Sequence, residues 1–158
     1  MALIRKLSII GIFISAGLMV AATYLALIGP PSRTAPLPEK TIEISGQRII
    51  VEIAATPQAL YQGLSGRSEL KAGHGMLFDF SESGERIFVM RDMLFPLDII
   101  FINQGRITKI AANLPPEGRA PLIRYSSDGP ADQVLELKAG YASERGFQVG
   151  DQVVIEKE

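Results

Sequence analysis

The sequence predicts an α+β fold that is mainly β: a compact antiparallel sheet curled into a small barrel-like or sandwich domain with one or two short helices, preceded by an N-terminal transmembrane or signal helix. Two observations predict the domain. About seven or eight short strand-like runs follow one another at close spacing, and one segment has a clear helical pattern. Small β domains hide the edges of their sheets by curling them or by stacking two sheets. A long apolar run near the N-terminus predicts the preceding helix.

The apolar run extends from Leu7 to Ile28 without a charged residue and follows Arg5 and Lys6. At about 1.5 Å per helical residue, it is long enough to cross a hydrocarbon core of about 30 Å. Positive charge ahead of the run predicts that the N-terminus stays in the cytoplasm and that the domain is exported. We therefore expect residues 1–28 to anchor the protein in the inner membrane, with the domain in the periplasm or otherwise outside the cytoplasmic membrane.

A cleaved signal peptide is the alternative to an anchor. Val20-Ala21-Ala22 has the small residues of a cleavage site and follows an apolar core at Leu7–Met19. Apolar residues continue beyond that point to Ile28, which favours the anchor. Cleavage would release a soluble periplasmic protein, so both alternatives export the domain.

Residues 29–40 are predicted to be a linker, because four prolines with Ser, Arg and Thr favour an extended, semi-rigid spacer. The β-rich domain is expected at residues 41–158. Three of the 16 basic residues precede Glu39, which leaves 13 bases against all 17 acids from Glu39 onward. A mildly acidic domain without a cluster of Lys and Arg is a poor nucleic-acid binder, so we expect no nucleic-acid partner. With no Cys and one His, we also expect no metal site and no cofactor.

The domain is predicted to begin with a β-hairpin and a short helix. Strand-like runs at 41–44 and 48–54 flank Ser45-Gly46-Gln47, a sequence typical of a hairpin turn. A helix is expected over residues 57–62, because Thr56 can cap its first turn and the proline after it lacks only an N–H group that would be unpaired there. The glycine that follows ends the helix.

Apolar runs predict the remaining strands, and clusters of Gly, Pro and polar residues predict the segments between them. We expect strands at 76–80, 87–90, 97–102, 106–111, 134–138 and 152–156. We expect a polar turn at 81–85, a hairpin loop at 103–105, a long surface loop at 113–132 and a helical turn at 139–146. The run at 97–102 follows Pro96 and is apolar on both faces except at Asp98, the pattern of a strand buried on two sides.

Asp98 is the main candidate for a functional or structural polar residue, because a buried carboxylate needs a partner. Arg67 and Arg91 lie on loop-like segments and are the natural donors, and backbone N–H groups are the alternative. Glu136, on another strand, is a second acid that could form an acid/base pair with Asp98. We name Arg67, Arg91, Asp98 and Glu136 as candidate binding residues, and we expect the role of Asp98 to be structural first.

Other reactive residue types give weaker signals. His74 lies between two glycines and could act as a general base, but no motif supplies a Ser or Cys nucleophile for it. Ser65 lacks the Gly-x-Ser-x-Gly context of a nucleophile elbow. Met76, Met90 and Met93 could suggest a Cu(I) site, although methionine in apolar strands more often fills the core.

A series of motifs in the domain resembles the family catalogued as domain of unknown function 192. The motifs are Gly63-Leu64-Ser65-Gly66-Arg67, Gly75–Phe78, Phe88–Met93, Pro96–Phe101, Val134–Leu137 with Ala139-Gly140, and Gly150-Asp151. The resemblance covers about residues 49–155 and implies a small β-rich fold, often behind an export signal, and no settled activity. Two residues depart from the family pattern: Val89, where Trp is usual, and Met93, where Thr is usual. If that Trp lines a ligand site, the site is altered here.

The sequence therefore favours a binding or accessory domain, tethered on the envelope side of the membrane and without a recognisable catalytic set. Its partners would be the membrane, through the N-terminal helix, and a small-molecule or protein ligand that the sequence does not identify. The alternative is a small envelope hydrolase that uses Asp98 and Glu136. An open cleft that contains both carboxylates would favour the enzyme, and carboxylates engaged by arginine or backbone donors would favour binding.

Overall fold

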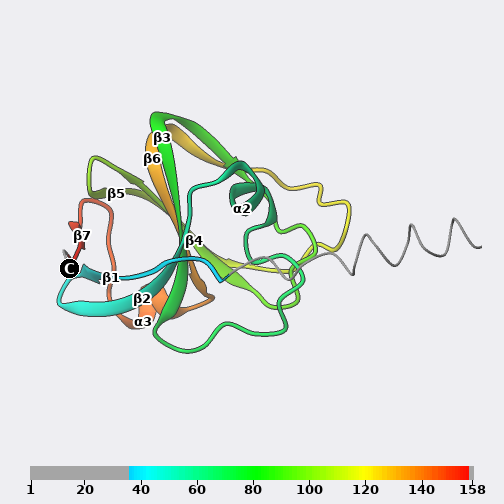
Figure 1. Ribbon diagram of the computed structural model, residues 1–158, viewed down its shortest axis with the longest axis horizontal. Helices are drawn as coiled ribbons and strands as arrows, with labels where there is room; N and C mark the ends of the chain where they lie inside the picture. The colour runs from blue at the N-terminus through cyan, green and yellow to red at the C-terminus, as the bar shows by residue number, and fades with distance from the viewer. Residues whose placement is uncertain (1–35, 157–158) are drawn as a thin grey trace, which may run out of the picture. The chain divides into compact units, whose positions relative to one another are not determined.

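The computed structural model describes residues 36–156, and the expected N-terminal helix at 1–28 and most of the expected linker lie outside the described residues (Figure 1). The strands are β1 (Glu39–Ile44), β2 (Gln47–Ala54), β3 (His74–Phe88), β4 (Leu97–Asn103), β5 (Arg106–Leu114), β6 (Tyr125–Lys138) and β7 (Val153–Ile155). The helices are α2 (Pro57–Gln62) and α3 (Tyr141–Glu144). The mainly β prediction with one or two short helices is confirmed.

The seven strands form one sheet in the order β5-β4-β6-β3-β2-β1-β7. Neighbouring strands are antiparallel except β2 and β3, which run parallel and therefore need a crossover connection, here residues 55–73 with α2. The two ends of the sheet meet at a bridge between Arg106 and Gln152. The N–H group of Ile107 donates to the carbonyl of Asp151 at 3.0 Å, next to this bridge. The sheet is thus curled and barrel-like, as expected, although not wholly antiparallel.

The predicted hairpins and the predicted helix lie where the sequence places them. Ser45 and Gly46 both have positive φ angles, 49° and 77°, which is the backbone of a two-residue hairpin turn. The second hairpin, expected with a three-residue loop, turns on Gln104 and Gly105. Helix α2 spans the predicted residues, and the hydroxyl of Thr56 caps it by accepting from an amide of its first turn.

Two expected connections are instead parts of strands. β3 continues through the expected turn at 81–85, and β6 begins inside the expected loop at 113–132 (Figure 1). The two strands pair as a long ribbon with register shifts, including one between Asp79 and Gly84. Hydroxyl groups hold the ribbon together: Ser127 Oγ accepts from the N–H of Arg86 at 2.9 Å. Polar sequences that contain glycine predict turns, but in this ribbon their residues lie in β3 and β6 and pair with the neighbouring strand.

Two apolar clusters lie on opposite faces of the sheet. The inner cluster includes Ile42, Ile44, Ile49, Val51, Leu77, Ile100, Ile102, Leu135, Leu137, Ala142 and Phe147. The outer cluster includes Ala54, Leu64, Met76, Phe78, Met90, Met93, Leu97, Ile99, Phe101 and Val134. Residues alternate between the two sets along β3, β4 and β6, because successive side chains of a strand point to opposite faces. The central strand β4 is therefore buried on both faces, as its sequence predicts.

Candidate functional site

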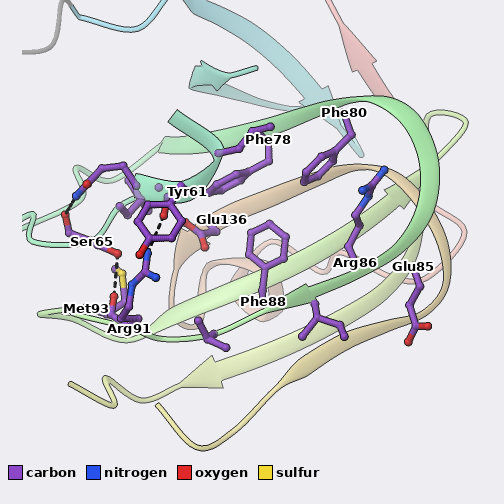
Figure 2. A pocket seen from close by; sticks show the side chains of 16 residues that line it. Tyr61, Ser65, Phe78, Phe80, Glu85, Arg86, Phe88, Arg91, Met93 and Glu136 are labelled. Atoms are coloured by element: carbon purple, nitrogen blue, oxygen red, sulfur yellow. Dashed lines mark hydrogen bonds between the residues drawn. The ribbon is translucent and has the colours of Figure 1, made fainter. Parts of the chain in front are cut away.

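Helix α2 and the segments that follow it cover part of the outer face of the sheet and leave a cavity of about 370 Å³ (Figure 2). The cavity is lined by Leu60, Tyr61, Gln62, Gly63, Leu64, Ser65, Phe78, Phe80, Glu85, Arg86, Ile87, Phe88, Val89, Arg91, Met93 and Glu136. The segment after α2 is attached to the segment after β3. Ser65 Oγ donates to the carbonyl of Arg91 at 2.8 Å, and the N–H of Gly66 donates to the carbonyl of Asp92 at 2.9 Å. These bonds hold the wall of the cavity opposite the sheet.

Four aromatic rings line the cavity: Tyr61 from α2, and Phe78, Phe80 and Phe88 from β3 (Figure 2). Phe78 and Phe80 are two positions apart on one strand and therefore share a face of the sheet. The rings of Phe78 and Phe88 meet edge to face with their centroids 4.9 Å apart. This geometry is a favourable one for aromatic pairs, and it gives the cavity a firm apolar wall.

Glu136 is the acidic group of the inner wall. It lies near the C-terminal end of β6, between Met76 of β3 and Ile99 of β4 in the pairing register. The residue is 5 % exposed, and its Oε2 atom has no hydrogen-bond partner among residues 36–156. Burial raises the pKa of Glu136 to about 8, against the opposing effect of the positive charge of Arg67. Its carboxyl group is therefore mostly protonated at neutral pH and has an oxygen free for a ligand.

Gly63, which ends α2, leaves room above Glu136. A Cβ atom at this position would lie 3.1 Å from Cζ of Phe78 and 4.0 Å from Oε2 of Glu136. The φ angle of Gly63 is 51°, a conformation that side chains rarely adopt. The sequence predicts this glycine as a helix stop, and the structure shows that it also brings the backbone close to the acid.

Arg67 lies near this wall but is engaged elsewhere. Its guanidinium group binds both carboxylate oxygens of Glu52, with Nη2 at 2.7 Å from Oε2. The pair raises the pKa of Arg67 and lowers that of Glu52, through the hydrogen bonds first. Glu52, Met76 and Glu136 occupy paired positions on β2, β3 and β6, so both acids lie on the outer face. The expected contact between Arg67 and Asp98 is therefore wrong.

Arg91 lines the cavity and packs on an aromatic ring. Its Cζ atom lies 4.2 Å from the centroid of Tyr61, and its Nη2 atom donates to the backbone carbonyl of the same residue at 2.8 Å. Arg91 was the other expected donor to Asp98, and that expectation is also wrong. The arginine instead fixes α2 to the segment that follows β3.

Asp98 accepts hydrogen bonds from three backbone N–H groups, which is the alternative that the sequence left open. The donors are Asn113 at 2.8 Å, Gly140 at 3.1 Å and Ala142 at 3.0 Å. Asp98 is fully buried, and it caps the first turn of α3 from a neighbouring strand. It joins β4, the end of β5 and α3, as expected of a structural residue.

The two acids do not share a site. Asp98 pairs with Leu137 across β4 and β6, whereas Glu136 pairs with Ile99. Paired residues project to the same face and their neighbours to the other, so Asp98 lies on the inner face and Glu136 on the outer face. An acid/base pair made of these two carboxylates, and the hydrolase built on it, are therefore wrong. Of the four candidate binding residues, Glu136 and Arg91 line the cavity, Arg67 lies beside it and Asp98 does not contribute.

The aromatic wall and Arg86 were not among the residues predicted from the sequence. The guanidinium of Arg86 lies 4.0 Å from the centroid of the Phe80 ring, and its Nε atom donates to the carbonyl of Ala131 at 3.1 Å. A signal was present, because Phe80 is a large apolar residue that continues the alternation of Phe78 into a polar stretch. Val89 and Met93, the two departures from the family pattern, both line the cavity.

The remaining residue types singled out from the sequence have other positions. Met76 and Met90 are fully buried in the outer cluster, as core-filling residues. The Nδ1 atom of His74 lies 3.2 Å from the carbonyl of Ala72, at the start of β3. Within residues 36–156, no three His, Asp or Glu side chains gather as metal ligands would. In the same part of the chain, neither helix has the length and apolar character needed to span a membrane.

Three comparisons relate the chain to known proteins. A crystal structure from Sinorhizobium meliloti 1021, described as a candidate transcription regulator, is 32% identical with a TM-score of 0.71, and the match covers 77% of this chain and 97% of that one. A protein of unknown function from Novosphingobium aromaticivorans DSM 12444 is 33% identical with a TM-score of 0.67, and that match covers 79% and 89% of the two chains. No curated protein matches. The model of the family DUF192, "Uncharacterized ACR", matches residues 40–155, so the chain belongs to this family, as its motifs indicate.

Proposed function

We propose that the protein is a binding domain for a small organic ligand, tethered on the envelope side of the membrane. The observation that carries the proposal is the cavity on the outer face, in which aromatic rings surround a buried acid, Glu136, whose Oε2 atom has no hydrogen-bond partner within residues 36–156. Ligand sites are typically concave and mostly apolar, with a few placed polar groups. The volume of about 370 Å³ is at the small end of their range, about 300–1,000 Å³.

The chemistry of the cavity supports binding more than catalysis. Nucleophilic catalysis needs a Ser, Cys or similar nucleophile within hydrogen-bond reach of a base. Ser65 is the serine of the lining, and its Oγ atom donates to a backbone carbonyl. Arg86 and Arg91 are bound to carbonyl groups and stacked on rings, as structural parts of the wall.

The location is inferred from the sequence. The apolar run from Leu7 to Ile28 behind Arg5 and Lys6 supports an anchor with the domain outside the cytoplasm. The mildly acidic composition of the domain does not favour nucleic-acid contact. We therefore do not propose that this chain regulates transcription, as the description of the Sinorhizobium relative would suggest.

The test compares retention of small molecules by the wild type and by a variant with a filled cavity. Val89→Trp places the residue that is usual in the family into the lining, and Val149→Trp adds the same ring at a site that is 65% exposed. Purified full-length proteins are incubated with small molecules extracted from the cell envelope, washed, and analysed by mass spectrometry. At least one compound should be retained by the wild type and Val149→Trp and lost from Val89→Trp. Equal retention by all three proteins would overturn the proposed function.

A further inference from the structure

We propose that the ligand of the cavity carries a protonated amine that pairs with Glu136, and an apolar body that packs among Phe78, Phe80 and Phe88. This inference rests on the proposed binding function and names the class of ligand. It starts from Glu136, which lines the cavity, and from its buried Oε2 atom, which has no hydrogen-bond partner in the described part of the chain. Figure 2 shows its carboxyl group directed into the space between Tyr61, Phe78 and Phe88.

A buried carboxyl oxygen without a hydrogen-bond partner costs about 1–3 kcal/mol, and once the group is ionised both of its oxygens need hydrogen-bond donors. Hydroxyl, amide and ammonium groups are all donors, and the surroundings of Glu136 distinguish between them. The faces of aromatic rings carry negative charge and attract cations within about 6 Å of the ring centre. Two rings of the lining already attract cations in this way: Arg91 stacks on Tyr61, and Arg86 stacks on Phe80. An ammonium group beside Glu136 meets both an acid and such rings.

The charges around Glu136 allow its carboxyl group to release a proton when an ammonium group binds. Beside the cavity are Arg67 and its partner Glu52, which form a pair. In the lining are Glu85, which accepts from Ser126 Oγ at 2.7 Å, and the two stacked arginines. When an ammonium ligand binds, the carboxyl group of Glu136 loses its proton to the solvent and the carboxylate pairs with the N–H groups of the ligand. One positive charge enters as one proton leaves, so the charge of the cavity does not change.

This exchange predicts a pH dependence. Because burial raises the pKa of Glu136 to about 8, the carboxyl group must be deprotonated before it can pair with the amine at neutral pH. The affinity for an amine should therefore rise about tenfold per pH unit up to pH 8 and then level off, as for any site that releases one proton. An alcohol, which needs no change of protonation, should bind without this dependence.

The experiment uses three probes that share a phenyl ring on a two-carbon chain: 2-phenylethylamine, 2-phenylethanol and 3-phenylpropionate. The full-length protein is labelled with ¹³C at its methionine methyl groups, five in all, of which Met93 lines the cavity and reports on binding by NMR. At pH 7.5 the amine should bind at least tenfold more tightly than the alcohol, and 3-phenylpropionate should bind more weakly than the amine because its carboxylate has no N–H group to donate to Glu136. Glu136→Gln should weaken amine binding about tenfold and leave alcohol binding within about threefold, since Gln keeps the shape and removes the charge.

The outcomes separate the inference from the function on which it rests. If the alcohol binds as tightly as the amine, or if the affinity for the amine does not change between pH 6 and pH 8, the amine inference is overturned and the binding function stands. The pH series on the wild type decides the matter even if Glu136→Gln does not fold, which its methionine spectrum would reveal. A Met93 resonance that none of the probes shifts would overturn both the inference and the proposed function.

Discussion

Two buried acids on adjacent paired positions of β4 and β6 have opposite surroundings. Asp98 faces the inner side of the sheet and accepts from three backbone N–H groups. Glu136 faces the outer side, and its Oε2 atom has no partner within residues 36–156. A carboxylate that is fully hydrogen-bonded stabilises the fold, whereas one that lacks partners costs free energy and is retained for another reason. The first is therefore a structural residue, and the second is the functional candidate.

Asp98→Asn should lower the free energy of unfolding by about 2–4 kcal/mol, because the amide replaces one acceptor oxygen by a donor that faces a backbone N–H group. Urea unfolding of the purified protein measures this. Asp79→Asn is the matched control: Asp79 is exposed and accepts from the side chain of Gln133, so its loss should cost less than about 0.5 kcal/mol. An unchanged midpoint for Asp98→Asn would exclude the structural role.

Glu136 should make stability fall as pH rises. In the unfolded chain the acid titrates near the ordinary pKa of 4.5, whereas burial raises the pKa in the folded state to about 8. Between these values the folded protein holds a proton that the unfolded chain has lost, so the free energy of unfolding decreases by at most about 1.4 kcal/mol per pH unit. The contribution of the neutral acid is complete below pH 4.5 and is lost by pH 8.

Urea unfolding at pH 5, 6.5 and 8 isolates this effect when the wild type is compared with Glu136→Gln, whose side chain stays neutral. With each increase in pH, the free energy of unfolding of Glu136→Gln should rise relative to that of the wild type. The exposed control Glu85→Gln should show the same pH dependence as the wild type. Parallel curves for the wild type and Glu136→Gln would show that Glu136 does not hold its proton in the folded state.

At this scale, the sequence predicts Asp98 better than Glu136. Asp98 interrupts an otherwise apolar strand, so its burial and its need for partners can be read directly. Its hydrogen-bond donors could not be read from the sequence, because the N–H groups of Gly140 and Ala142 come within reach only when β4 and β6 pair. The missing hydrogen-bond partner of Glu136 Oε2 could not be predicted from the sequence either, because it depends on the folded chain, in which Arg67 binds Glu52.

At the scale of elements, β3 packs closely against β6 at Gly75. A Cβ atom on Gly75 would lie 2.7 Å from Cδ2 of Leu137 and 2.8 Å from the carbonyl oxygen of Glu136. This close approach sets the distance between β3 and β6, the two strands that carry Phe78, Phe80 and Glu136. Gly75 therefore helps to position the cavity wall, although it does not line the cavity.

Gly75→Ala should lower the free energy of unfolding by about 1–3 kcal/mol, because the added methyl group forces the backbone of β6 to move. Gly129→Ala is the matched control on β6: no atom lies within 4 Å of the position of its Cβ, so the change should be neutral or stabilise by up to about 1 kcal/mol. Thermal unfolding of the two variants compares them. Equal loss in both would show that β3 and β6 can separate freely.

The local signals of turns and caps predicted elements well. Thr56 and the glycine after α2 mark its ends, and the glycines of two hairpins mark their turns. The ribbon of β3 and β6 was missed because the residues that form it, such as Ser127 and Pro130, are typical of loops. Strand pairing across more than 40 residues, with hydroxyl groups in the ladder, overrides that local preference.

For the whole molecule, the sequence predicts a curled, mainly β sheet, and the structure confirms it. The apolar run of β4 predicts a strand buried on two sides, and the apolar clusters on the two faces of the sheet confirm this. The runs of apolar residues could not show the parallel pairing of β2 and β3, which depends on the path of residues 55–73. The cavity arises from these two features together.

The proposed N-terminal membrane anchor gives a further prediction. A periplasmic reporter enzyme fused after Glu158 should be active, and the full-length protein should stay in the membrane fraction, because Arg5 and Lys6 precede the apolar run. Activity of a cytoplasmic reporter at the same position would contradict this orientation. A soluble form that begins near Thr23 would instead establish cleavage of a signal peptide.

The separation of the two apolar clusters has an evolutionary consequence. The inner cluster and the bridge between Arg106 and Gln152 close the sheet without residues from α2 or from the segment after β3. Mutations in those covering segments can accordingly reshape the cavity while the scaffold remains intact. Val89, where relatives usually have Trp, is one such change, since it lies in the cavity lining. Members of the family can thus diverge in specificity on a common sheet, and their chemistry is to be compared in the covering segments.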